Sequence, residues 1–414
     1  MPKKILCPYC FHEFQNTEAW YQCTNREYNA VGEEICQSVV DEVFNEHWKY
    51  VNVLSKRCYK GTPFKKGFFR SSSDPQEEEC PNCKTLSNRY VCPHCHNWLP
   101  TEMIKEGAEI ISIIGAPSSG KTVYFISLIH ELERQGFKLG IKIKAQDEAP
   151  DQDKRTSAIY QAKSDLMFDE HVLPEKTSEG RPVPLIFNLT TKKRDNPKKG
   201  RSIYLVFYDT AGESFDNTEQ ISDMARYLRE SSGIIMLIDP FSVSALRTTL
   251  EAGGFSVPKT SSRATFGLDT LLGYIDQERG KELGDKPFAI TFSKIDAVIN
   301  GLEASNAAYS IAGVDLKENS SFITTKQFDL NETEQIHNAL VRVCEDEWDI
   351  GHVFDAALTK FSRENVKLFA VSSLGSQPTS SGTFESIKPY RVMDPLVWIL
   401  TRMGGFDIPI KKKN

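Results

Sequence analysis

Six apolar runs recur along the chain after residue 106, and stretches with a helical spacing of apolar residues separate them. Short runs rich in Ile, Val, Leu and Phe predict buried strands, and strands that alternate with helices are typical of an α/β domain. We therefore predict a mostly parallel six-stranded sheet between helices. Its strands are expected at residues 109–115, 184–190, 202–209, 233–239, 287–293 and 367–373.

Local signals add detail to this sheet. The second and third runs are joined by TKKRDNPKKGR, whose Asn-Pro and Gly favour a turn, so we expect an antiparallel hairpin there. The helix after residue 115 carries apolar residues at i, i+3, i+4 and i+7 from Phe125 to Leu132, and Gly136 can end it. The last helix is expected to start with Asp394 as its cap and to stop at Gly404.

Nine of the ten cysteines lie before residue 96. The start of the chain lacks the long apolar stretch of a signal peptide, and Cys-x-x-Cys pairs in a reducing compartment indicate metal binding before disulfides. We expect a cysteine-rich zinc module at 1–105 and an α/β domain at 106–414, with insertions around 244–286 and 297–360. The tenth cysteine, Cys344, is expected to be buried in a helix.

The stretch CPNCKTLSNRYVCPHC contains two Cys-x-x-Cys pairs separated by eight residues. Four thiolates on two short turns fit a tetrahedral Zn²⁺ without an open position, which is typical of a structural site. The expected ligands are Cys80, Cys83, Cys92 and Cys95. A second zinc set is expected to comprise Cys7, Cys10, Cys23 and Cys36, with Cys58 and His12 as alternatives to the last. The first pair could instead share an ion with a later pair, because spacing does not fix connectivity.

Composition limits the partners. The chain has 40% hydrophobic and 26% charged residues and a formal net charge of -6, and no apolar run approaches the roughly 20 residues that span a bilayer. The segment 39–54 reads as an amphipathic, partly acidic helix within the zinc module. We therefore expect a cytosolic protein whose zinc module contacts protein partners, and neither nucleic acid nor a membrane.

The stretch IIGAPSSGKTVYF, from residue 113, joins a predicted strand to a predicted helix. A glycine, four residues, a second glycine, lysine and threonine in this position form a phosphate-binding loop. Lys121 can reach the β- and γ-phosphates, and Thr122 can offer its hydroxyl to Mg²⁺. The expected nucleotide-binding residues of the loop are Gly115, Ala116, Pro117, Ser118, Ser119, Gly120, Lys121, Thr122 and Val123.

Two later strands are predicted to end in an aspartate that could hold Mg²⁺, Asp209 and Asp239. The stretch DTAGE starts at Asp209 and places Gly212 three residues further on. The backbone N–H of this glycine can sense a γ-phosphate and move when the phosphate leaves. Asp239 is followed by Pro-Phe-Ser, so we expect it only to end a buried strand.

The stretch TFSKID presents Lys294 and Asp296 after an apolar strand. A carboxylate can accept hydrogen bonds from the N1–H and the amino group of guanine, whereas adenine lacks this donor pair. The lysine stem can lie along the purine face. Small residues after the next strand let a backbone N–H approach the base oxygen; they are Ser372, Ser373 and Leu374.

The order GAPSSGKT, DTAGE, SKID and SSL resembles the nucleotide-binding motifs of Ras-like P-loop GTPases. With the cysteine module in front, the chain is similar to the bacterial double-GTPase families of the TRAFAC class. This resemblance implies that Lys121 binds phosphate, that Thr122 and Asp209 hold Mg²⁺, and that Asp296 selects guanine. It also implies a switch threonine, for which Thr177 is our choice, and a setting in multi-protein bacterial signalling or conflict systems.

Three residues depart from the family pattern. Ser293 stands where asparagine is usual, which weakens or replaces one bracing bond. Glu213 stands where a water-orienting glutamine is frequent, and Pro117 stands where glycine is frequent. We therefore expect slow hydrolysis and a weak response to an arginine-finger activator.

These features predict a GTPase switch with GTP or GDP, Mg²⁺ and Zn²⁺ as cofactors. The residues expected at the reaction itself are Lys121, Thr177, Gly212 and Glu213. Protein partners would read the switch regions and the zinc module, and a nucleotide-dependent dimer remains open. The alternatives are a P-loop ATPase that uses Asp239 for Mg²⁺, and a degenerate module that holds nucleotide only to recruit partners.

Overall fold

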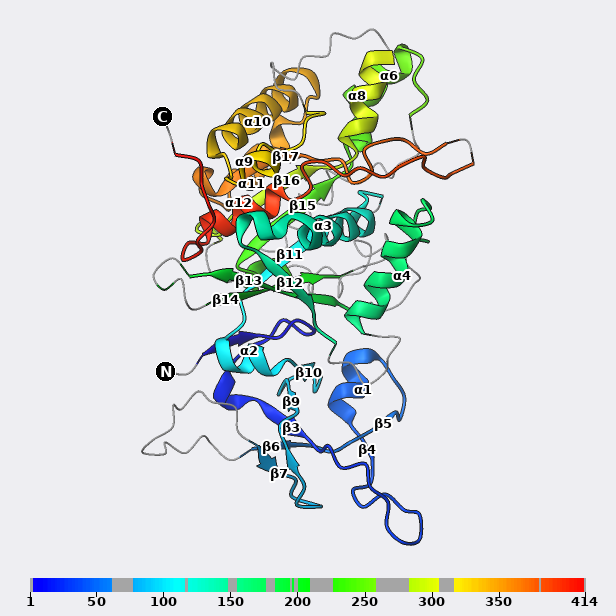
Figure 1. The fold of residues 1–414 in the computed structure, drawn as a ribbon, viewed down its shortest axis with the longest axis vertical. Coiled ribbons are helices and arrows are strands. Elements are labelled where there is room, and N and C mark those ends of the chain that lie inside the picture. Colours follow the sequence, from blue (N-terminus) through cyan, green and yellow to red (C-terminus); the bar gives the residue numbers. More distant parts are fainter. Residues whose placement is uncertain are drawn as a thin grey trace. The chain divides into compact units, whose positions relative to one another are not determined.

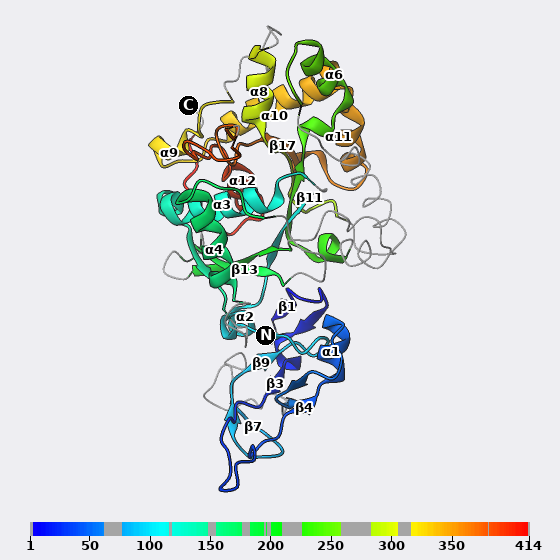
Figure 2. The same ribbon diagram turned by 90° about the vertical axis from the view of Figure 1, so that its right-hand side faces the viewer.

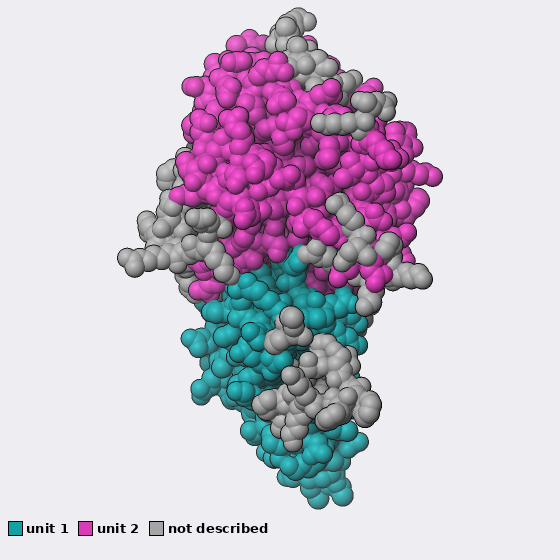
Figure 3. All heavy atoms as spheres, turned by 90° about the vertical axis from the view of Figure 1, so that its left-hand side faces the viewer, with its two compact units in different colours: residues 1–110, 146–155 teal, residues 111–145, 156–414 magenta. Residues whose placement is uncertain are grey.

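The structure is a computed structural model of the 414-residue chain. It describes residues 3–61, 77–115, 118–147, 155–175, 183–193, 196, 200–208, 226–257, 283–304, 316–379 and 381–412. The chain divides into two compact units, which Figure 3 distinguishes by colour. The first unit comprises Met1–Ile110 with Gln146–Arg155, and the second comprises Ile111–Ala145 with Thr156–Asn414.

The second unit is built on a sheet of seven strands in the order β12-β13-β14-β11-β15-β16-β17 (Figure 1). The strands are β11 (Ile110–Gly115), β12 (Lys142–Ala145), β13 (Leu185–Lys192), β14 (Gly200–Phe207), β15 (Gly233–Ile238), β16 (Phe288–Phe292) and β17 (Val366–Ala370). The sheet is mostly parallel, as expected, but six strands were too few. The additional strand is β12, at the edge of the sheet, where β13 is its one neighbouring strand.

The pairing of the strands aligns the ends that carry the sequence motifs. β11, β15, β16 and β17 are parallel, with Gly115 opposite Leu237 and Ile238 opposite Phe292. The segments that follow these strands therefore emerge at one edge of the sheet, where open α/β sheets bind ligands. β13 and β14 form the predicted antiparallel hairpin, and β12 pairs antiparallel with β13.

Helices cover both faces of this sheet. α3, α4 and α12 share one hydrophobic core with the strands, in which the ring of Phe125 stacks on Phe207 at 4.4 Å between centroids. Figure 2 shows α3, α4 and α12 on one side of the sheet and α11 on the other. The described α-helices of the unit are α3 (Lys121–Gln135), α4 (Thr156–Phe168), α6 (Ser244–Ala252), α8 (Ile295–Ala304), α9 (Phe322–Thr325), α10 (Leu330–Arg342), α11 (Gly351–Leu358) and α12 (Asp394–Arg402).

Cys344 is buried, as expected, in a π-helical turn after α10. Asp394 does not cap α12, because it is already the first residue of that helix and no side chain caps its start. Its carboxylate instead pairs with buried Arg391 at 3.2 Å.

The first unit consists of short strands held around the cysteines. Its strands are β1 (Lys4–Leu6), β2 (Glu13–Gln15), β3 (Trp20–Gln22), β4 (Val39–Val40), β5 (Leu54–Ser55), β6 (Cys58–Lys60), β7 (Glu78–Glu79), β8 (Leu86–Ser87), β9 (Tyr90–Val91) and β10 (Trp98–Leu99). Its helices are α1 (Glu42–Trp48) and α2 (Thr101–Glu106). None of the described helices in either unit is long and apolar enough to cross a membrane.

The helix predicted at 39–54 is shorter than expected. The carboxylate of Asp41 accepts a hydrogen bond from the Phe44 N–H at 3.1 Å and so starts α1, and Lys49 ends it with a φ of 58°. The valines of β4 before the helix pair antiparallel with β5 after it. Such β-branched residues favour an extended backbone over a continued helix.

Candidate functional site

The phosphate-binding loop begins at the end of β11. The backbone at Gly115 passes so close to its neighbours that a Cβ there would lie 2.6 Å from the Ser119 hydroxyl and 2.7 Å from the Leu237 carbonyl oxygen. Ser118 and Gly120 adopt left-handed φ values of 63° and 77°. These tight turns deliver the chain directly into the first residue of α3.

Lys121 folds back over this loop. It is the first residue of α3, and its Nζ donates a hydrogen bond to the Gly115 carbonyl oxygen at 2.8 Å. The hydroxyl of Ser119 is fully buried and has no hydrogen-bond partner among the described residues. A buried donor without a partner costs about 1–3 kcal/mol, so the loop is incomplete by itself. Thr122 and Val123 follow in the first turn of α3 and are half-buried.

Lys294 connects the base-selecting motif to the phosphate loop. Its Nζ donates to the Ser118 carbonyl oxygen at 2.7 Å and pairs with the Asp239 carboxylate at 2.8 Å. The other oxygen of Asp239 accepts the Phe241 N–H at 3.0 Å, and the side chain is buried. Asp239 therefore holds a lysine and starts a short helical turn, which disfavours the alternative in which it binds Mg²⁺.

Sequence reasoning missed this ion pair, although the signal was available. Asp239 follows β15 and Lys294 follows β16, and these two strands are parallel neighbours. Residues just beyond the carboxyl ends of such neighbours lie close together. The hydroxyl of Ser293, the residue before Lys294, donates a hydrogen bond to the Ile238 carbonyl oxygen at 3.2 Å. This bond connects the carboxyl ends of the two strands.

Asp296 lies in the first turn of α8 and is buried. Its Oδ1 accepts a hydrogen bond from the Ser372 hydroxyl at 2.6 Å. Burial raises the pKa of the Asp296 carboxyl, while the Ser372 hydroxyl and the charge of Lys294 act in the opposite direction. The Ser372 oxygen in turn accepts the Gly375 N–H at 2.7 Å, so the carboxylate is oriented by a fixed turn.

The turn after β17 is held from two sides. The Ser127 hydroxyl of α3 donates to the Ser373 carbonyl oxygen at 2.8 Å, and the Lys388 N–H donates to the Leu374 carbonyl oxygen at 2.9 Å. A Cβ at Gly375 would lie 2.3 Å from the Lys388 oxygen, so only glycine fits. The structure thus brings the loop, Lys294, Asp296 and the turn after β17 together within the second unit.

The remaining predicted site residues lie outside the described residues. They are Ala116, Pro117, Thr177, Asp209, Gly212 and Glu213.

Eight of the nine cysteines of the first unit form two groups of four. The grouping differs from the expected ligand sets and matches the alternative in which the first pair shares an ion with a later pair. Cys80 and Cys83 do not share a group with Cys92 and Cys95. The first group consists of Cys7, Cys10, Cys92 and Cys95, and the second of Cys23, Cys36, Cys80 and Cys83. Cys-x-x-Cys motifs that are neighbours along the chain therefore belong to different groups. The reason is that β3 is hydrogen-bonded to both β6 and β9, which brings distant segments together.

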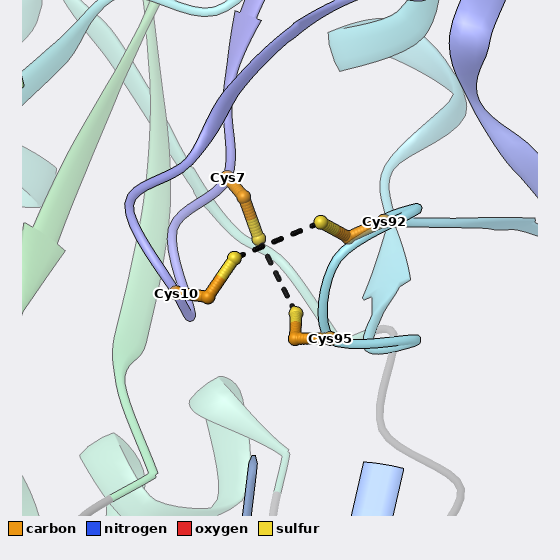
Figure 4. A group of neighbouring side chains, drawn as sticks. All are labelled: Cys7, Cys10, Cys92 and Cys95. Carbon is orange, nitrogen blue, oxygen red and sulfur yellow. Dashed lines mark hydrogen bonds between the residues drawn. The ribbon is translucent and has the colours of Figure 1, made fainter. Parts of the chain in front are cut away.

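The distances within each group fit zinc. In Figure 4 the four sulfurs of the first group point toward one another from the turns after β1 and β9. Sulfur–sulfur distances are 3.7 Å for Cys7 to Cys95 and for Cys10 to Cys92. In the second group they are 3.6 Å and 3.9 Å. A tetrahedron with Zn–S bonds of about 2.3 Å has edges of about 3.8 Å, whereas a disulfide needs about 2.05 Å.

The turns that carry the Cys-x-x-Cys pairs share one backbone geometry. In each, the carbonyl oxygen of the first cysteine accepts the N–H of the residue four positions later, at 2.9–3.0 Å. That residue has a left-handed φ: 57° for Phe11, 61° for Lys84 and 53° for His96. Burial raises the pKa of the Cys7 and Cys95 thiols, so these two sulfurs need a nearby cation to be held as thiolates. Both groups could hold zinc.

Comparisons with known proteins agree with the motifs. The sequence profile of the Double-GTPase 2 family matches residues 109–348, which include the phosphate loop and Asp296. One relative is the "Putative ESX-1 scaffolding and assembly protein SaeC" of Mycolicibacterium smegmatis. It is 22% identical over 325 residues, which cover 76% of this chain and 80% of the relative. Because the profile spans more than half of the 414 residues, the chain belongs to the Double-GTPase 2 family.

Proposed function

We propose that this protein binds GTP with Mg²⁺ and hydrolyses it slowly to GDP and phosphate, as a switch in a multi-protein bacterial system. The observation that carries the proposal is the convergence of Lys121, Lys294 and Asp296 at one edge of the sheet. Lys294 touches the phosphate loop at Ser118, so the loop and the base-selecting motif form one continuous site.

Guanine is the base that this site suits best. Asp296 is buried, and Ser372 orients its carboxylate. A guanine would offer two donors to this acceptor, whereas an adenine would leave the buried carboxylate without partners. In the ATPase alternative, Asp239 would bind Mg²⁺. Its carboxylate already accepts hydrogen bonds from the Lys294 side chain and the Phe241 N–H, which disfavours that alternative.

The phosphates would be held by the loop from Gly115 to Thr122. The buried Ser119 hydroxyl lacks a partner among the described residues, so it can donate a hydrogen bond to a phosphate oxygen. Backbone N–H groups in the left-handed turns at Ser118 and Gly120 can donate in the same way. Lys121 would exchange the Gly115 carbonyl oxygen for phosphate oxygens. Bound Mg²⁺ would neutralise charge on the β- and γ-phosphates, and Thr122, Thr177 and Asp209 are the residues proposed to hold it.

The switch would act through Gly212, whose backbone N–H is proposed to respond to the γ-phosphate. Glu213 and Pro117 are proposed to keep hydrolysis slow, the first by repelling the phosphates and the second by narrowing the approach of an arginine from a partner. Faster single-turnover GTP hydrolysis in Glu213→Gln or Pro117→Gly supports this part of the proposal. A rate that is unchanged or slower in both variants contradicts it.

The zinc module is proposed to contact a protein partner. Large apolar side chains are exposed on it, including Val31 at 79%, Val51 at 84% and Leu54 at 62%. The name of the relative, a scaffolding and assembly protein, supports a role in a protein assembly. The alternative is a nucleotide-dependent dimer of this chain. Light scattering with GDP and with a GTP analogue separates the two, because the molar mass doubles with one of the nucleotides only if this dimer forms.

The proposal is tested by titrating the purified chain with GTP, GDP and ATP in the presence of Mg²⁺. Asp296→Ala is expected to weaken guanine nucleotides about 100-fold or more, through loss of two hydrogen bonds to a charged group. The control is Asp355→Ala, which removes an exposed carboxylate from α11. ATP binding as tight as GTP binding, or an Asp296→Ala variant that binds like the control, contradicts the assignment.

A further inference from the structure

One group of metal-type side chains lies outside both cysteine groups. Asp41 precedes α1, Cys58 lies on β6, and His96 follows the last cysteine of the Cys92–Cys95 turn. One carboxylate oxygen, the sulfur and one ring nitrogen all lie within 4.8 Å of one another. Cys58 is the cysteine of the first unit that belongs to neither group of four, and sequence spacing gave it no pair.

The three side chains are held from several elements. His96 Nδ1 lies 2.8 Å and 2.9 Å from the two carboxylate oxygens of Asp41. The left-handed backbone of His96 is fixed by its N–H, which donates to the Cys92 carbonyl oxygen at 3.0 Å. The ring of Trp20 lies 5.0 Å from the imidazole between centroids and covers it.

Cys58 is oriented in the same way. The side-chain amide of Gln22 donates to the Cys58 sulfur at 3.6 Å. The oxygen of that amide accepts the indole N–H of Trp98 at 2.5 Å, which fixes which end of the amide faces the sulfur. An N–H that points at sulfur stabilises the thiolate, the form of cysteine that binds a metal.

The group is largely removed from solvent. The side chains of His96 and Asp41 are 8% and 7% exposed, and Cys58 is half-buried. A carboxylate, an imidazole and a thiol that face one another in a buried site are satisfied together by a cation.

We propose that Asp41, Cys58 and His96 hold a third Zn²⁺. One sulfur, one nitrogen and one oxygen ligand suit zinc and exclude Ca²⁺ and Mg²⁺, which prefer oxygen alone. Around zinc, nitrogen and oxygen ligands at about 2.0–2.1 Å are about 3.4 Å apart, so binding moves Asp41 and His96 apart by about half an ångström. Three protein ligands leave one position open for water or an external ligand, unlike the two closed cysteine groups.

The test is the molar ratio of zinc to full-length protein after equilibration with excess Zn²⁺ and removal of the free ion. The wild-type chain is expected to hold three equivalents, one for each group. Cys58→Ser is expected to hold two, and so is His96→Asn, which removes the imidazole with a residue that tolerates a left-handed backbone. Cys344→Ser, which removes a buried thiol from the second unit, is the control and should hold three.

Substitution with Co²⁺ adds an independent measurement. The difference spectrum between the wild-type chain and Cys58→Ser is expected to contain the thiolate-to-cobalt charge transfer of one sulfur. Two equivalents in the wild-type chain, or equal ratios in wild type and Cys58→Ser, would overturn the proposal and leave a buried hydrogen-bonded cluster. If a variant fails to fold, the ratio of the wild-type chain still decides. The zinc ratio is measured without nucleotide, so its outcome is separate from that of the proposed GTPase activity.

Discussion

Ser372→Ala removes the hydroxyl that holds the proposed guanine-binding carboxylate. That hydroxyl donates to Asp296 at 2.6 Å and accepts the Gly375 N–H at 2.7 Å. A hydrogen bond to a charged group contributes about 1.5–3 kcal/mol, and part of this is recovered from water or from the bound base. Since about 1.4 kcal/mol corresponds to a factor of ten, we expect guanine nucleotides to bind about tenfold more weakly.

The same variant should change the pH dependence of binding. Burial raises the pKa of Asp296, and the Ser372 hydroxyl opposes that rise. The base needs the ionised carboxylate, so affinity falls as pH falls through this pKa. Without the hydroxyl the pKa rises further, and the fall in affinity begins at a higher pH than in the wild-type chain.

The assay is isothermal titration with GDP across a series of pH values, with Ser373→Ala as the control. Ser373 contributes its carbonyl oxygen to the Ser127 hydroxyl, and that contact survives the substitution. Equal affinities of Ser372→Ala and wild type, with superimposable pH profiles, would refute the reasoning that Ser372 orients Asp296.

Three further predictions follow from the site and the cysteine groups. Gly115→Ala should lower the free energy of unfolding by about 1–3 kcal/mol, because its Cβ meets the Leu237 oxygen at 2.7 Å. A melting temperature equal to that of Gly284→Ala, where the nearest atom is 3.4 Å away, contradicts this. Asp239→Asn should weaken GDP about tenfold by removing the ion pair of Lys294, and unchanged GDP affinity by titration contradicts it. Removal of zinc by a chelator under reducing conditions should expose new protease cleavage sites before residue 106, and an unchanged fragment pattern opposes a structural role for the metal.

The sheet was largely predictable because its central strands are short, mostly apolar and wholly buried. Every residue of β11, β15 and β16 is buried, and the sequence that joins β13 to β14 contains Asn-Pro, which favoured a hairpin. The edge strand β12 was not predictable in the same way. Its sequence, KIKA, is four residues long and half exposed, so it lacks the apolar run that marked the others.

The cysteine groups show where sequence reasoning stops. The motifs identified the ligands as a set, but the partition of Cys7–Cys10 with Cys92–Cys95 depends on strand pairing between distant segments. Local spacing contains no information about that pairing. The same holds for Cys58, which has no neighbouring cysteine or histidine at a metal-like spacing and meets His96 only in the folded unit.

The central claim is that Asp296 selects guanine, and an exchange of base specificity tests it most directly. Asp296→Asn replaces one carboxylate acceptor with an amide donor, which matches xanthine, where an oxygen stands in place of the guanine amino group. Asp296→Asn is expected to lose GDP affinity and to gain affinity for xanthosine diphosphate, whereas the wild-type chain is expected to prefer GDP. A variant that binds both nucleotides as the wild-type chain does would contradict the claim.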